Sequence, residues 1–83
     1  MHPTIGRMVH YMARGSADGE FPPVCRAAVV TEADAVDPER VGLCVLNPGG
    51  LFFRPLDAGG CEHDEVDKLG GTWHWPERVE GNA

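Results

Sequence analysis

The segment Trp73-His74-Trp75 contains the side chains of this sequence that are best suited to holding a flat ligand. Residues two apart in an extended strand lie on one face, about 7 Å from each other, so the two indoles share a face and His74 points to the other. Two indoles at this spacing can stack against a nucleobase or a sugar. Because a small core also needs large aromatic side chains, packing in the interior is the favoured alternative for one or both rings.

Three arginines could supply the positive charge that an anionic ligand needs. Arg7, Arg26 and Arg54 fall in segments that we expect to be strands, where their side chains could meet on one wall and bind a phosphate or carboxylate bidentately. Surface ion pairs are the favoured alternative. His10 and Tyr11 follow on the same segment as Arg7, and Tyr11 is the single tyrosine. The sequence therefore predicts a ligand site composed of Trp73, Trp75, Tyr11, Arg26, Arg54, Arg7, His10 and His74.

Cys61 and His63 are the candidate metal ligands. Their spacing puts both side chains on one side of an extended loop, and thiolate and imidazole are ligands that zinc prefers. A complete site needs more ligands, such as Cys25, Cys44 or His74, and the sequence has no second paired motif. We therefore predict no bound metal and no cofactor, and interpret this stretch as a solvated acidic loop.

Recognisable catalytic motifs are absent from the sequence. Ser16 is the lone serine, and nothing marks the pairs Cys25/His10 or Cys61/His63 as a nucleophile with its base. The Gly-Gly pairs do not match a phosphate-binding loop, and we assign them to hinges and turns. The protein is predicted not to be an enzyme.

The charge balance excludes several partners. Thirteen acidic residues oppose seven basic ones, for a net charge of −6. Residues 57–83 contain seven of the acids against Lys68 and Arg78, a net charge of −5. Such a surface repels duplex nucleic acid and anionic membranes, whereas a small anion needs only one or two local cations.

Size and cysteine content narrow the class further. A chain of 83 residues forms one domain with a thin core, so we expect a homo-oligomer. Three cysteines form no disulfide framework, and the N-terminal stretch lacks the apolar run of a signal peptide. No stretch approaches the roughly 20 apolar residues of a membrane span. We expect a cytoplasmic protein.

Short β-rich runs separated by turn residues predict a mainly β domain. Asn47-Pro48-Gly49-Gly50 has the chemistry of a type II turn and predicts a hairpin. Ser16–Pro23 and Pro55–Gly71 are expected to be loops, the second long enough to act as a lid. The expected strands are Ile5–Met12, Val24–Thr31, Val41–Leu46, Leu51–Arg54 and Thr72–Trp75. We predict one five-stranded SH3-like barrel over residues 1–76, with an OB-like barrel as the alternative, and a frayed acidic tail over 77–83.

Four segments resemble a group of small actinobacterial, phage and prophage proteins. The segments are Gly6–Tyr11, Cys25–Glu32, Leu43–Phe53 and Gly71–Glu77, of which the last, Gly-Thr-Trp-His-Trp-Pro-Glu, is the most specific. The resemblance spans most of the chain and implies an SH3-like barrel, without assigning an activity.

Two functions follow as expectations. The first is non-catalytic binding of a small nucleotide-like ligand, because phages encode small proteins that sequester nucleotide-type immune signals. The second is a structural or protein-interaction barrel, such as a virion component or an adaptor, because aromatic side chains on such barrels often form peptide grooves.

Overall fold

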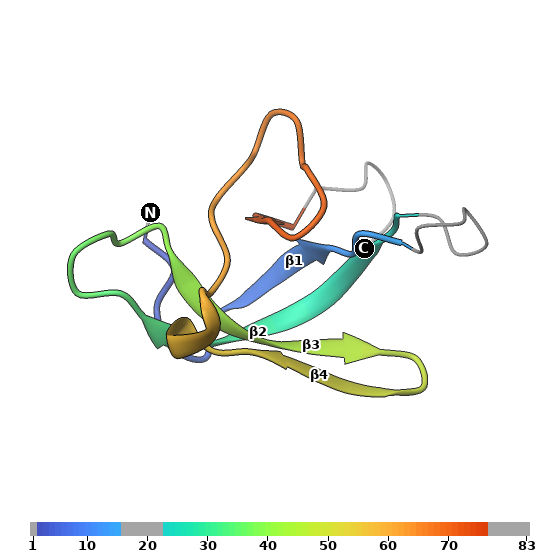
Figure 1. Cartoon of the computed structure of the whole chain (residues 1–83), viewed down its shortest axis with the longest axis horizontal. Coiled ribbons are helices and arrows are strands. Elements are labelled where there is room, and N and C mark those ends of the chain that lie inside the picture. The colour runs from blue at the N-terminus through green and yellow to red at the C-terminus, as the bar shows by residue number, and fades with distance from the viewer. Residues whose placement is uncertain (1, 16–22, 77–83) are drawn as a thin grey trace.

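One antiparallel sheet of five strands makes up the fold, as the computed structural model of residues 2–15 and 23–76 shows (Figure 1). The strands are β1 (Met8–Met12), β2 (Cys25–Ala33), β3 (Val41–Asn47), β4 (Gly50–Arg54) and β5 (Trp73–His74), with a 3₁₀ turn η1 at Leu56–Ala58. Their order in the sheet is β4-β3-β2-β1-β5. The expected mainly β class is confirmed, and the arrangement is consistent with a small β-barrel-like domain. Within the described ranges, no helix has the length and apolarity to cross a membrane.

Strand alternation places the core on one face of the sheet. Val9 and Tyr11 of β1 point inward, as do Ala28 and Val30 of the neighbouring strand β2. Residues of β3 and β5, together with Cys61 from the segment between η1 and β5, complete this inner face. The buried hydrophobic residues are Val9, Tyr11, Ala28, Val30, Val41, Leu43, Val45, Cys61 and Trp73.

The predicted central hairpin is confirmed, but its predicted turn type is wrong. β3 and β4 pair in register from Leu43↔Arg54 to Asn47↔Gly50, leaving Pro48 and Gly49 as the turn. A type II turn requires a positive φ at Gly49, and Gly49 is not among the glycines with positive φ. Glycine permits a left-handed conformation without requiring it, so the sequence could not decide the turn type.

Both terminal strands are shorter than predicted. Gly6 has φ +90°, and the amide of Arg7 donates to the carbonyl of Thr4, so the chain turns there and β1 begins only at Met8. β5 ends at His74 because the amide of Trp75 donates to the Glu65 carboxylate instead of to a strand. The predicted tail and most of the predicted loop Ser16–Pro23 lie outside the described residues.

The long predicted loop is partly structured and covers the inner face of the sheet. After η1, the chain arches above the sheet (Figure 1). Cys61 exchanges two backbone hydrogen bonds with Val41, at 2.8 and 3.1 Å, and His63 forms a parallel bridge with Trp73. The segment 59–72, called the cover segment below, therefore closes over β5.

The two tryptophans differ in burial, which gives a direct test of this packing. We expect Trp73→Phe to lower the free energy of unfolding by about 2 kcal/mol, because it removes buried indole volume and an indole hydrogen bond. Trp75→Phe changes a half-buried ring and is expected to cost less than about 1 kcal/mol. Urea unfolding followed by circular dichroism measures both. Equal losses would contradict the packing.

Candidate functional site

The structure divides the predicted ligand residues among three places. Trp73, Trp75 and Arg7 form one group at β5, and Tyr11 and Arg54 face a pocket at the hairpin end of the sheet. His10 and His74 lie with Cys25 on the opposite, outer face. The structure therefore does not bring the eight predicted residues together in one place, because strand parity sends neighbouring residues to opposite faces. Arg26 lies on β2 as the cross-strand partner of Tyr11.

Trp73 is a core residue. Its side chain is 1% exposed, and its ring stacks on His63 with centroids 4.3 Å apart and planes inclined by 24°. The indole Nε1–H donates to the carbonyl of Glu39 at 2.8 Å. The ring has a protein partner on its face and at its polar edge, so it cannot stack on a ligand in this arrangement.

Trp75 shares the face of Trp73, as predicted, and is only partly buried. The two rings meet edge to face, with centroids 5.1 Å apart. The guanidinium of Arg7 lies over the Trp75 ring, 5.4 Å from its centroid. This cation–π pair is local to β5 and is not part of the pocket lined by Tyr11 and Arg54.

A pocket of about 240 Å³ opens between the end of β1 and the β3–β4 hairpin. Two guanidinium groups, two aromatic rings and one carboxamide contribute to its wall. The lining residues are Tyr11, Ala13, Arg14, Val45, Asn47, Phe52 and Arg54. Tyr11 and Arg54 belong to the predicted set, whereas Arg14 was missed because it follows the strand and carries no motif.

Arg14 and Arg54 converge from different strand ends. Burial raises the pKa of the Cys61 thiol, while the positive charges of both Arg54 and Arg14 act in the opposite direction on the same sulfur. Arg54 also lies 5.9 Å from the centroid of the Phe52 ring. Within residues 2–15 and 23–76 neither guanidinium pairs with a carboxylate, in contrast to Arg40, which pairs with an aspartate and a glutamate. The pocket therefore has an excess of positive charge.

The Gly70-Gly71 pair makes room for Arg14. A methyl group built on Gly70 would lie 2.9 Å from Arg14 Cγ, and one on Gly71 would lie 2.7 Å from both Nε and Nη2 of the guanidinium. Gly71 also has φ +90°, which other residues rarely adopt. This pair was assigned to hinges and turns, and its position against Arg14 gives it a second role in placing a cation.

Arg26 lies beside this pocket on β2. Its Cα is the cross-strand partner of Tyr11, and the side chain is half-buried on the inner face. Its Nε is buried and lacks a hydrogen-bond partner among the residues that the structure describes. A buried donor of this kind, on the strand paired with Tyr11, adds a further group that an anion could satisfy.

Cys61 and His63, the predicted metal candidates, take up different roles. Cys61 is 1% exposed in the core, whereas His63 Nε2 lies 2.9 Å from Glu65 Oε1 and its Nδ1 lies 3.6 Å from Glu39 Oε2. The three-residue group with metal-binding geometry found within the described ranges is His10, Cys25 and His74. Neither Cys61 nor His63 belongs to it.

Acidic side chains of the cover segment accept backbone hydrogen bonds and do not only face solvent. Asp64 Oδ1 accepts the amide of Asp67 at 3.0 Å and Oδ2 that of Leu69 at 3.2 Å. Glu65 accepts the amide of Trp75 at 3.0 Å. The acidic residues thereby tie the cover segment to itself and to the strand end that it covers.

No family model, no curated protein and no solved structure matches this chain.

Glu65 of the cover segment is expected to make the free energy of unfolding depend on pH. Burial raises the pKa of Glu65, but the hydrogen bonds from Trp75 and His63 outweigh it, so the pKa lies below its ordinary value of 4.5. A carboxyl with a lowered folded pKa stabilises the protein above its unfolded pKa and loses that contribution as the pH falls through the folded value. We expect stability to decline as the pH drops below about 4.5, and less steeply in Glu65→Gln.

Chemical unfolding of the two proteins at several pH values between neutral and acidic measures this difference. Asp57→Asn, which changes an exposed carboxyl on η1, is the matched control. An acid dependence that is the same in Glu65→Gln and wild type would contradict the role assigned to Glu65.

Proposed function

We propose that the protein is a non-catalytic binder of a small anionic ligand with a flat ring, of the nucleotide type. The observation that carries the proposal is the convergence of Arg14 and Arg54 on a pocket whose walls include Tyr11 and Phe52. Guanidinium groups recognise phosphate bidentately, and aromatic rings hold a base by stacking. Binding takes place on an SH3-like barrel in this proposal, which the strand order β4-β3-β2-β1-β5 supports.

The size of the pocket limits the ligand. At about 240 Å³ it lies below the roughly 300 Å³ at which pockets begin to enclose drug-sized molecules. A phosphate with part of a nucleoside fits this space better than a whole dinucleotide. Phe52 is 43% exposed, so its ring extends the site beyond the pocket and offers a stacking surface for the rest of the ligand.

The lining residues favour binding over catalysis. Those identified within the described ranges offer cations, hydroxyl and amide groups and apolar walls, with no carboxylate or imidazole to act as a base. Cys61 lies close to both guanidiniums, but the raised pKa of its buried thiol keeps it protonated at neutral pH. Sequestration of a nucleotide-type signal in the cytoplasm of a phage-infected cell is the role that we propose for such binding, with the sequence resemblance as its support.

Calorimetric titration with AMP, cyclic AMP, a cyclic dinucleotide and inorganic phosphate tests the proposal. We expect at least one nucleotide to bind more tightly than phosphate, and Arg54→Gln and Arg14→Gln each to weaken it by tenfold or more, since a hydrogen bond to a charged group contributes about 1.5–3 kcal/mol. Gly70→Ala is expected to weaken binding by displacing Arg14 while keeping its charge.

Arg7→Gln is the matched control, because Arg7 lies over Trp75 and does not line the pocket. If none of these compounds binds at high micromolar concentration, the proposal is wrong. Equal weakening by Arg7→Gln would place the ligand at β5 instead.

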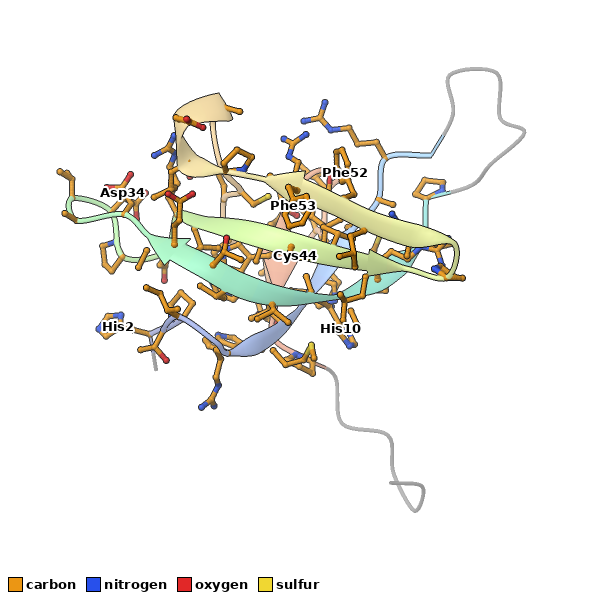
Figure 2. All side chains as sticks on the ribbon, turned by 90° about the horizontal axis from the view of Figure 1, so that it is seen from below. His2, His10, Asp34, Cys44, Phe52 and Phe53 are labelled. Carbon is orange, nitrogen blue, oxygen red and sulfur yellow. The ribbon has the colours of Figure 1, made fainter. Side chains whose placement is uncertain are left out.

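A second candidate function, self-association, is favoured by the apolar outer face of the sheet. Phe53 and Leu51 are each 61% exposed, and Leu46 is 37% exposed. Phe53 pairs with Cys44 and Leu51 with Leu46, so these side chains share one face of β3 and β4. Cys44 on β3 and Phe53 on β4 are labelled in Figure 2, where the sheet is seen from below. β4 is also an edge strand, with backbone groups available for pairing. We propose that a second copy covers this patch, which is defined as Cys44, Leu46, Leu51 and Phe53.

Replacing the most exposed aromatic side chain tests this association. We expect native mass spectrometry and sedimentation to show an oligomer for wild type and a shift toward monomer for Phe53→Ser. Val36→Ser is the control, because Val36 is 91% exposed but lies on the connector between β2 and β3. A wild-type protein that remains monomeric at high micromolar concentration would rule out the second copy, and the patch would then have to meet a different protein.

A further inference from the structure

Two histidines and a cysteine meet on the outer face where β5, β1 and β2 lie side by side. His10 of β1 is the direct cross-strand partner of His74 of β5. On the other side, His10 pairs with Ala27 of β2, so Cys25 lies two residues along on the same face and is diagonal to His10. Three adjacent strands therefore each supply one side chain to a cluster. This cluster shares no residue with the arginine pocket and lies on the opposite face of the sheet.

The side-chain atoms are close enough for joint coordination. Cys25 Sγ lies 3.1 Å from His74 Nε2, and one ligand atom from each of the three residues lies within 4.8 Å of the others. The two imidazoles meet edge to face, with ring centroids 5.4 Å apart. Ligands bound tetrahedrally to one zinc ion at 2.0–2.3 Å are separated from each other by about 3.5 Å. Small side-chain rotations bring the cluster to that spacing.

We propose that His10, Cys25 and His74 form a metal site that takes Zn²⁺, with the fourth coordination position open to water. Imidazole nitrogen and thiolate sulfur are the donors that zinc prefers, and three protein ligands with one open position is the arrangement typical of reactive or exchangeable zinc. Cys25 binds as the thiolate, so one proton passes to solvent for each metal bound.

The burial of the three residues suits such a site. His74 is fully buried and His10 is half-buried, so the two imidazoles are held by the surrounding strands before the metal arrives. Cys25 is exposed and provides the route from solvent. A site assembled on paired strands is more rigid than one assembled on a loop, which favours tight and geometrically selective binding.

The same atoms could instead work as a thiol with its histidine base, because Cys25 Sγ and His74 Nε2 are within hydrogen-bond distance. A nucleophilic thiol has to remain accessible and reactive, whereas a zinc-bound thiolate is shielded. Metal titration and thiol alkylation therefore distinguish the two roles.

The first experiment titrates chelator-treated protein with Co²⁺ and then with Zn²⁺. We expect one Co²⁺ per chain, with the sulfur-to-cobalt charge-transfer absorption of a thiolate ligand, and displacement by Zn²⁺. Cys25→Ser is expected to lose the charge-transfer band and to weaken Zn²⁺ binding at least 100-fold. It replaces an exposed side chain, so the variant should fold even if His74→Gln does not.

Cys44→Ser and His2→Gln are the matched controls, since each changes the same residue type outside the cluster, and His2 is exposed and away from the Trp73 packing. We expect both to bind one metal as wild type does. We also expect Zn²⁺ to slow alkylation of Cys25 at least tenfold, with little effect on Cys44. Metal binding that survives Cys25→Ser, the absence of a charge-transfer band, or alkylation of Cys25 that is unaffected by Zn²⁺ would each overturn the proposal.

Discussion

Burial of the Trp73 indole between the sheet and the cover segment is the interaction on which the rest of the structure depends. The ring fills the inner face beside Tyr11, stacks on His63 and donates its indole N–H to the Glu39 carbonyl. These contacts hold a two-residue strand, which is too short to be stable by backbone pairing alone. Because a domain of 83 residues has a thin core, one large ring contributes a substantial share of its buried apolar surface.

Because Trp73 points to the inner face of the sheet, the directions of the neighbouring side chains are determined as well. Strand alternation then sends His74 to the outer face, where it meets His10 and Cys25, and returns Trp75 to the inner face. The cover segment that closes over Trp73 also carries the Gly-Gly pair that accommodates Arg14. The cationic pocket and the histidine–cysteine cluster are thus consequences of one packing arrangement, placed on opposite faces so that occupation of one leaves the other accessible.

The parts of this fold that depend on local sequence were predictable, and those that depend on strand register were not. The β3–β4 hairpin follows from Asn47-Pro48-Gly49-Gly50 between two β-rich runs, and the shared face of the two indoles follows from their spacing. Which indole is sealed depends on the cover segment, which no local pattern specifies. Arg14 becomes a pocket residue only through Gly70 and Gly71, and Cys25 becomes a neighbour of His74 only through the pairing of β1 with both flanking strands.

Hydrogen exchange at the indole N–H of Trp73, followed by NMR, tests the central claim most directly. Burial of the Trp73 indole predicts that this proton exchanges only when the whole domain unfolds, at the rate of the slowest core amides of β2 and β3. The indole N–H of half-buried Trp75 serves as the internal reference and should exchange much faster. Rapid exchange at Trp73, comparable to that of Trp75, would mean that the cover segment does not close, and the positions of both sites would lose their physical basis.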